Sequence, residues 1–459
     1  MSCTSRIRLA IHHLAAVGIA LLTLASAPAG AIDAPVYFRV NTTADLIDDN
    51  TADHVCHTSA NTCSLRAAIM QANHQNTNGL TRIDVPPGIY KLTLPVLMDG
   101  NDGEDRGDLN LTTPIDPGQL TVIAGAGAAA TIIDGNHSDD VFSIDQGRKV
   151  TIFDVTIRNG YNFFNGGGIT NRGTLDISFC TIEGNQARTS GGGIENIFGI
   201  LRVAFCTIRS NTADSGGGVF SAGTTKIEYS TISGNAANSG GGIYNDGDLT
   251  VVNSTVSGNT ANANGGGIYS RIHAYLYNTS VIDNIADLDH DAAGGSGGGV
   301  YSEASGGSFL LTNSLIVRNT INGGYDDDDC NGGFALYGFN LFGNVVGCTF
   351  SGNGDAAWRF ISSPNSIGPL QDNGGVSGHT QTHALLAGSN AIDTTYDQGC
   401  IDETGSLLFY DQRGAPRVAG QRCDVGAFEF GAVVDTIFYN GFENPNLPEV
   451  VSLPLLTHP

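Results

Sequence analysis

Between about residue 150 and residue 320, short runs of alternating apolar and polar residues recur with a fixed period. Each repeating unit contains three consecutive glycines and, later, one asparagine at a matching position. The glycine runs begin at Gly166, Gly191, Gly216, Gly240, Gly265 and Gly297, and the asparagines are Asn185, Asn211, Asn235, Asn259, Asn284 and Asn319. The intervals are 24 to 26 residues except for the last in each series. A period of this length is typical of a solenoid.

Aliphatic residues occupy three positions of every unit, which indicates three columns of side chains. The columns are Ile182, Ile208, Ile232, Val256, Val281 and Ile316; then Ile177, Val203, Ile227, Val251, Leu276 and Leu311; then Ile169, Ile194, Val219, Ile243, Ile268 and Val300. β-Branched residues in two-residue alternation are strand chemistry, and no unit has room for a helix of helical periodicity. The pattern predicts an all-β fold, a right-handed parallel β-helix with coils of about 25 residues.

The glycine and asparagine positions are expected to serve the turns. Glycine permits positive φ in a tight corner and lets neighbouring coils approach closely. Asparagine suits left-handed turn conformations and can hydrogen-bond along the stack. We therefore interpret both series as turn ladders and not as an active site.

The N-terminal segment has the pattern of a secretory signal peptide. Arg6 and Arg8 precede an apolar run from about Leu14 to Leu24, and Ala29-Gly30-Ala31 offers a cleavage site, so residues 1–31 are expected to be removed. No other apolar stretch is long enough for a membrane-spanning helix. We expect a secreted or cell-surface protein without a transmembrane segment in the mature chain.

Net charge restricts the class of partner. The chain has 21 Lys and Arg against 45 Asp and Glu, a formal charge of −24, and loss of the two signal-peptide arginines makes it about −26. Nucleic-acid binding depends on basic residues that neutralise phosphates, so we expect no nucleic-acid partner.

Eight of the nine cysteines remain once Cys3 is removed with the signal peptide, an even number that favours disulfides in an oxidising compartment. Their spacing pairs Cys56 with Cys63, Cys330 with Cys348, and Cys400 with Cys423. The last two, Cys180 and Cys206, stand at matching positions of neighbouring coils. They are either a fourth disulfide or small residues in a ladder.

The G-G-G-I and I-x-x-N pattern resembles the polymorphic outer membrane protein repeats, a likeness that implies a surface-displayed β-helix. Upstream, Cys63-Ser64-Leu65-Arg66 resembles the CSLREA module found at the N-terminus of exported bacterial β-helix proteins, although Ala67 replaces the motif's Glu. Residues 64–73 read as a short helix that caps the first coil, which a solenoid needs.

The C-terminal third resembles other modules of exported proteins. Residues from about 368 to 430 are similar to the choice-of-anchor Q module, and Ile437, Phe438, Gly441, Phe442 and Glu443 are similar to an I-F-x-x-G-F-E tail motif. The expected organisation is a signal peptide (1–31), a CSLREA-like cap with the first strands (35–95), β-helix repeats (96–325), a choice-of-anchor Q-like module (326–430) and the tail (431–459).

An aromatic residue follows the aliphatic column behind four of the glycine runs. These residues are Phe220, Tyr244, Tyr269 and Tyr301, and alternation turns them outward, so they should stack on one face. We call them the aromatic strip. It is either a ladder that stabilises the stack or a ligand-binding face that offers flat apolar area edged by hydroxyls.

Acidic loops are candidates for calcium, although no cofactor is required by the sequence. The candidate ligands are Asp99, Asn101, Asp102 and Asp105 in one loop and Asp287, Asp289 and Asp291 in another. Their oxygens are the hard ligands that calcium takes, but the spacing is not that of an EF-hand. Solvated acidic loops are the alternative interpretation.

Enzymes are found among parallel β-helices, but the fold alone does not assign catalysis. Glycoside hydrolysis usually needs two converging carboxylates. Asp139-Asp140 is a candidate pair, yet no matching acid is evident on the neighbouring coil at a shared offset. Arg158, Arg209 and Arg318 lie near one strand without an evident array of aspartates beside them.

The sequence therefore predicts no catalytic residues and favours a non-catalytic binding or adhesion protein whose partner is an extracellular polysaccharide or a cell-surface component. A polysaccharide lyase or glycoside hydrolase with a divergent site is the first alternative. A structural surface protein that associates with itself is the second.

Overall fold

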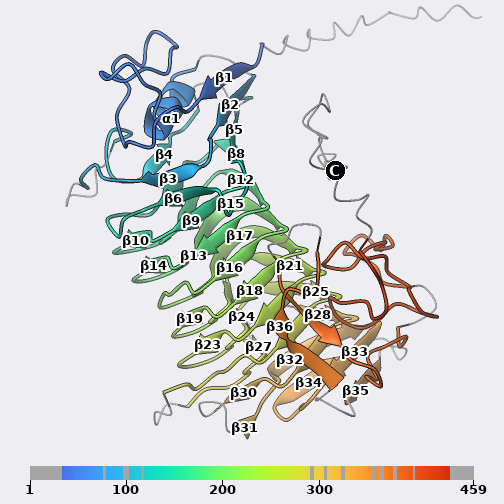
Figure 1. The fold of residues 1–459 in the computed structure, drawn as a ribbon. Coiled ribbons are helices and arrows are strands. Elements are labelled where there is room, and N and C mark those ends of the chain that lie inside the picture. The colour runs from blue at the N-terminus through green and yellow to red at the C-terminus, as the bar shows by residue number, and fades with distance from the viewer. Residues whose placement is uncertain are drawn as a thin grey trace, which may run out of the picture.

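The computed structural model describes residues 34–434 except 76–78, 97–102, 115–117, 290–293, 304–307, 322–325, 353–356, 361–365, 376–379 and 396–398. The signal peptide and the tail motif lie outside the described residues. The described chain forms a right-handed parallel β-helix, with one helix at its N-terminal end and a C-terminal module against its flank (Figure 1). The predicted fold class is confirmed.

Two long parallel sheets make up the stack. The larger has 18 strands among the described residues: β1 (Val36–Arg39), β2 (Leu80–Asp84), β4 (Leu109–Leu111), β5 (Leu120–Ala124), β7 (Phe142–Ile144), β8 (Lys149–Phe153), β11 (Ile169–Asn171), β12 (Thr174–Ser178), β15 (Ile194–Ala204), β17 (Val219–Glu228), β20 (Ile243–Asn245), β21 (Asp248–Val252), β24 (Ile268–Ser270), β25 (His273–Tyr277), β27 (Val300–Ser302), β28 (Phe309–Thr312), β32 (Cys330–Tyr337) and β34 (Cys348–Ser351). The second has 11 in the same ranges: β3 (Gly88–Lys91), β6 (Thr131–Asp134), β9 (Thr156–Arg158), β13 (Thr181–Glu183), β16 (Thr207–Arg209), β18 (Thr231–Ser233), β22 (Thr255–Ser257), β26 (Ser280–Ile282), β29 (Leu315–Val317), β33 (Phe339–Phe342) and β35 (Ala357–Phe360).

Short strand pairs complete the described elements. The pairs β10 (Tyr161–Asn162) with β14 (Gln186–Ala187) and β19 (Ala236–Ala237) with β23 (Thr260–Ala261) are parallel and lie at a third side of the coils. The pairs β30 (Thr320–Ile321) with β31 (Asp326–Asp327) and β36 (Ile367–Gln371) with β37 (Thr382–Leu385) are antiparallel.

The three predicted aliphatic columns fill the interior. Ile182, for example, pairs in register with Ile157 on one side and Ile208 on the other, and every residue of the three columns is at most 1% exposed. Stacking at the parallel-strand spacing places like side chains over like, so the pattern of the sequence becomes a continuous apolar core.

The asparagines form a buried hydrogen-bonded ladder, but they do not adopt the left-handed conformation that we expected of them. The side-chain oxygen of Asn211 accepts from both the backbone and the side-chain amide of Asn185, each at 3.0 Å, and the same pair of bonds recurs up the stack. Positive φ belongs instead to the residue before each asparagine, such as Gly184 and Ser210. The corner is therefore made by the preceding residue, which leaves the asparagine side chain directed along the stack.

The glycine runs make tight corners, as expected. Gly240 has φ +64°, and a Cβ atom on the following Gly241 would lie 2.3 Å from the carbonyl oxygen of Thr260 on the next coil. Such an overlap is far inside van der Waals contact, so these positions require glycine.

The helix α1 (Leu65–Asn73) packs against β2 and β4 at the N-terminal end of the stack (Figure 1). Ser64 caps it by accepting from the amide of Ala67 at 3.0 Å. Arg66 is 1% exposed and forms an ion pair with Asp45 at 2.7 Å. Because α1 lacks the family's Glu at position 67, an acid from the preceding loop supplies the buried partner.

The solenoid continues beyond residue 325, where the sequence placed the end of the repeats. Strand β32 pairs in parallel with β27 and β28, and β33 and β35 continue the second sheet. At the end of the ladder the Asn position is taken by Asp329, which accepts both amides of Asn319 at 2.9 and 2.8 Å. Burial raises the pKa of Asp329 to about 7.

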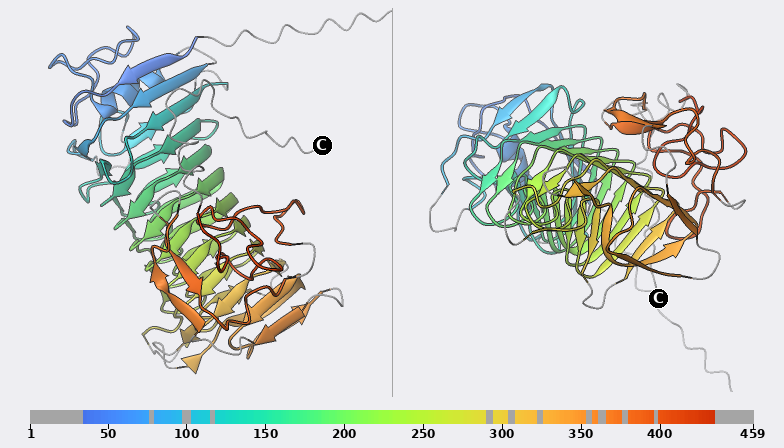
Figure 2. Two further views of the ribbon diagram at one scale, coloured as in Figure 1. Left: turned by 45° about the vertical axis from the view of Figure 1, so that its right-hand side comes forward. Right: turned by 90° about the horizontal axis from the view of Figure 1, so that it is seen from below.

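Residues from about 366 to 434 fold back against the second sheet of the solenoid (Figures 1 and 2). An apolar patch that includes Ile282, Leu315 and Val425 joins the two parts. Hydrogen bonds add to it, such as that from the Asn253 side chain to the carbonyl of Tyr410 at 2.9 Å.

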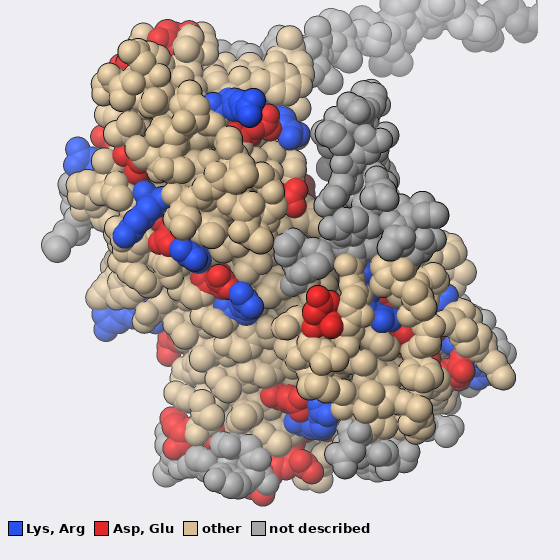
Figure 3. Space-filling model, in the orientation of Figure 1, with Lys and Arg blue, Asp and Glu red and all other residues tan. Residues whose placement is uncertain are grey.

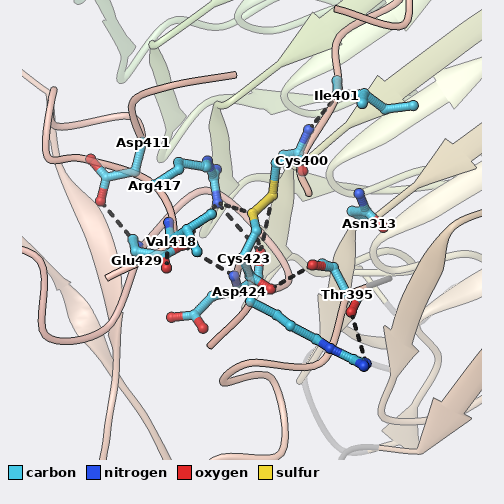
Figure 4. Close-up of a disulfide and its surroundings, with 12 residues drawn as sticks. Asn313, Thr395, Cys400, Ile401, Asp411, Arg417, Val418, Cys423, Asp424 and Glu429 are labelled. Atoms are coloured by element: carbon cyan, nitrogen blue, oxygen red, sulfur yellow. Dashed lines mark hydrogen bonds and ion pairs between the residues drawn. A yellow bond between two sulfur atoms is a disulfide. The ribbon is translucent and has the colours of Figure 1, made fainter. Parts of the chain in front are cut away.

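Buried charges hold this module together around a disulfide (Figure 4). Arg417 and Glu429 are fully buried and lie 3.7 Å apart, beside the Cys400–Cys423 bond. The other two predicted disulfides, Cys56–Cys63 and Cys330–Cys348, are also present. Cys180 and Cys206 are buried and not bonded, so the ladder interpretation holds for them.

Within the part of the chain that the structure describes, no helix is long and apolar enough to cross a membrane. On the face shown in Figure 3, Lys and Arg lie mostly beside Asp and Glu instead of forming one large patch of either sign. Arg158, Arg209 and Arg318 follow this rule, since they pair with Asp134, Glu183 and Asp283 at 2.8, 2.6 and 2.7 Å.

Candidate functional site: an acidic cleft on the first coils

Three aspartates from two neighbouring coils converge near the N-terminal end of the solenoid. In β4, Leu109 and Leu111 point into the core, and they stand in register with Phe142 and Ile144 of β7 on the next coil. Asp108 immediately precedes β4. The pair Asp139-Asp140 comes shortly before β7, so the stacking of the two strands brings the three acids together.

The three carboxyl groups each place an oxygen within 4.8 Å of the others. Asp108 and Asp140 are only 5% and 4% exposed. The side-chain amide of Asn162 donates toward Asp139 at 3.4 Å and toward Asp140 at 3.3 Å, which fixes the pair from one side. Burial, with the neighbouring carboxyls of Asp108 and Asp139, raises the pKa of Asp140 well above its ordinary value.

The group is chemically able to share a proton or to coordinate a hard cation. Carboxylate oxygens are ligands that calcium and magnesium accept, and crowding of like charges disfavours three ionised acids at one place. Among the described residues this is the one group of three or more His, Cys, Asp or Glu side chains whose ligand atoms converge.

These acids form part of the wall of a cleft of about 770 Å³ that Asn162, Phe163, Phe164 and Arg172 also line. Asn162 organises the rim, because its side-chain oxygen accepts from the amides of Phe164 and Asn165 at 2.8 and 3.2 Å. The two phenylalanines are 52% and 66% exposed and meet edge to face at 5.3 Å. The cleft thus combines a flat apolar rim with oxygen and amide groups.

Sequence reasoning singled out Asp139-Asp140 but found no acid at a matching offset on the neighbouring coil; that conclusion is wrong. Asp108 is the missing partner, 31 residues before Asp139 and therefore outside the regular period. The signal that could have found it is the alternation Leu109-x-Leu111 and Phe142-x-Ile144, which aligns the two coils despite the longer spacing.

The predicted calcium ligands are not brought together in the described residues. Asp99, Asn101, Asp102 and Asp291 lie outside them. Asp105 pairs with Arg106 at 3.5 Å, Asp289 is exposed, and Asp287 is buried with one oxygen that has no hydrogen-bond partner among the described residues. Calcium binding at these positions stays a prediction.

The aromatic strip stacks as predicted. Ring centroids of Phe220, Tyr244, Tyr269 and Tyr301 follow one another at 5.3, 4.7 and 5.0 Å with planes within 17° of parallel. Their residues pair in register on β17, β20, β24 and β27. Because the flat faces cover one another, the strip presents mainly ring edges, and the hydroxyl of Tyr269 donates to Glu303 at 2.9 Å. Ligand binding by the strip stays a prediction.

Comparison with known proteins gives one family match and one similar structure. Residues 253–271 match the Chlamydia polymorphic membrane protein repeat. A crystal structure of pectate lyase Pel9A is similar over 87% of this chain and 97% of that chain, with 14% sequence identity and a TM-score of 0.42. No similar sequence was found among curated proteins. The repeat match covers the turn between β22 and β24, which contains a triple glycine and Tyr269 of the aromatic strip.

Proposed function

We propose that this chain is an exported, extracellular or cell-surface β-helix protein that binds a glycan in the acidic cleft without catalysis. The observation that carries the proposal is the exposed Phe163–Phe164 pair beside convergent carboxyl and amide groups in one cleft. Aromatic rings offer flat apolar area to a sugar ring, and oxygen and amide groups can hydrogen-bond its hydroxyls. The three disulfides support export, since such bonds persist in oxidising compartments.

The geometry favours binding over hydrolysis. Glycosidases place two carboxyls on either side of the scissile bond, about 5–5.5 Å apart in retaining and 6.5–9.5 Å apart in inverting enzymes. Asp139 and Asp140 are consecutive residues held by the same Asn162 amide, so they approach a ligand from one side. Catalysis by a lyase or hydrolase remains the alternative, favoured by the raised pKa of Asp140, which is typical of a general acid.

The aromatic strip is a second candidate surface for contact with a glycan or a cell-surface component. It is half-buried and offers a regular row of ring edges with tyrosine hydroxyls. The cleft is favoured because its phenylalanine rings are not stacked into a ladder.

The test is affinity gel electrophoresis of the mature protein in gels containing different polysaccharides. Phe163→Ala/Phe164→Ala should abolish retardation by a bound polymer. Phe198→Ala is the matched control, since Phe198 is 88% exposed on β15 and does not line the cleft. Retention of binding by the double variant would refute the cleft as the site. Release of new reducing ends from a polymer would show an enzyme instead.

A further inference from the structure

A second hollow continues the acidic cleft along the axis of the solenoid. It has a volume of about 460 Å³, and Tyr161 lines both it and the cleft. The backbone amide of Tyr161 donates to the carbonyl of Asp139 at 2.8 Å, so this residue joins the acidic cluster directly to the start of the second hollow.

The second hollow is built from one position repeated on successive coils. Tyr161 pairs in register with Gln186, which is followed by Thr212, Ala236 and Thr260. Parallel strands repeat at about 4.8 Å, so the four steps from Tyr161 to Thr260 span about 19 Å. An elongated ligand is needed to fill a hollow of this shape.

Alternation gives the hollow two rows of side chains with small residues between them. Each unit reads x-Ala-x, as in Gln186-Ala187-Arg188, and Ala187 and Ala237 are buried. The second row is exposed and consists of Arg188, Asp214, Asn238 and Asn262. Between the rows only alanine methyl groups and backbone rise from the floor, so a chain can lie there without a steric barrier.

The lining of the second hollow is polar and balanced in charge. Arg188 and Asp214 are its two charged residues, of opposite sign, and the other polar groups are amides, hydroxyls and the phenol of Tyr161. Such groups match the hydroxyls of an uncharged sugar chain. A polyanion would also meet the three carboxyl groups at the cleft end and a protein of strongly negative net charge.

We propose that the ligand is a neutral, linear polysaccharide that lies parallel to the solenoid axis and occupies the cleft and the second hollow together. This inference rests on the proposed glycan binding and specifies the class, direction and length of the ligand. Affinity should therefore grow with chain length well beyond a disaccharide.

The experiment begins with affinity gels containing xylan, mannan or mixed-linkage β-glucan, with polygalacturonate as the charged comparison. Titration calorimetry then uses oligosaccharides of two to eight units from the polymer that binds. Affinity should rise at least about tenfold from the shortest to the longest. Asn238→Ala/Asn262→Ala should lower affinity for the longest oligosaccharide severalfold and leave that for the disaccharide unchanged. Thr250→Ala, outside both hollows on β21, is the control.

The outcomes separate the two proposals. Binding that is sensitive to Phe163→Ala/Phe164→Ala but independent of length, or unaffected by the asparagine variant, overturns the inference and leaves the proposed function standing. Preferential binding of polygalacturonate overturns the neutral class. Absence of binding to every polymer overturns the proposed function and the inference with it.

Discussion

Replacing Asn235 by alanine should be among the most damaging single substitutions in the solenoid. The side chain is fully buried and takes part in four hydrogen bonds. Its oxygen accepts from the backbone and side-chain amides of Asn211, each at 3.0 Å. Its amide donates to the carbonyl of Ile208 at 3.0 Å and to the side-chain oxygen of Asn259 at 2.9 Å.

The magnitude follows from the groups left without partners. Alanine would deprive the buried backbone amide of Asn211 and the carbonyl of Ile208 of these bonds, and no space is open for water in a packed coil. With about 1 kcal/mol for each lost bond and more for each orphaned buried group, the loss of unfolding free energy should be about 3–6 kcal/mol.

Asn235→Asp separates the ladder's chemistry from its shape. The carboxylate could still accept from Asn211, but it would face the oxygens of Ile208 and Asn259, to which it cannot donate when ionised. The variant should therefore lose more stability at pH 8 than at pH 4. Aspartate is tolerated at the ladder's end because Asp329 meets only donors, two from Asn319 and the amides of Gly343 and Asn344 at 2.8 and 2.7 Å.

The assay is urea unfolding followed by far-ultraviolet circular dichroism, with Asn262→Ala as the control. Asn262 is an exposed asparagine on the next coil, and its replacement should change stability by less than about 0.5 kcal/mol. If Asn235→Ala costs less than about 1 kcal/mol relative to this control, the ladder does not contribute as argued.

Three further outcomes are expected. Gly241→Ala should prevent folding or cost several kcal/mol because its Cβ would overlap a carbonyl oxygen, whereas Gly234→Ala, where φ is +61° and nothing lies within 4 Å, should cost about 1 kcal/mol in the same unfolding assay. Burial raises the pKa of Glu195 to about 7, so the folded chain holds a proton that the unfolded chain loses near pH 4.5 and stability declines as pH rises between these values; Glu195→Gln should raise the melting temperature at pH 8, by up to about 3 kcal/mol of stability, but not at pH 4. Tyr244→Phe/Tyr269→Phe keeps the stacked rings and should leave polysaccharide retardation unchanged, and loss of retardation would assign binding to the aromatic strip.

The repeating part of the fold could be predicted because each coil carries its own instructions. Alternation fixes which residues point inward, and the period places Ile182 over Ile157 and under Ile208 without knowledge of any other contact. The three disulfides followed from spacing alone. These are local or single-period relations, which a sequence displays directly.

The turn conformation was only partly predictable. Asparagine tolerates the left-handed region, so the sequence favoured it there, but the positive φ falls one residue earlier. The buried ladder decides this, because the side chain of Asn211 must lie along the stack to accept two amides of Asn185. A propensity of one residue gave way to a hydrogen-bond network of many.

The sequence by itself determined the period, the three interior columns and the outward aromatic strip, because strand alternation and coil stacking act on neighbours at fixed spacing. The tertiary structure decided that Asp108 joins Asp139 and Asp140, since a lengthened coil separates them in sequence while the strands β4 and β7 keep register. It also decided that the strip's faces cover one another and that the cleft and the second hollow meet at Tyr161. Such relations depend on the three-dimensional distance between coils of unequal length, which no residue pattern encodes.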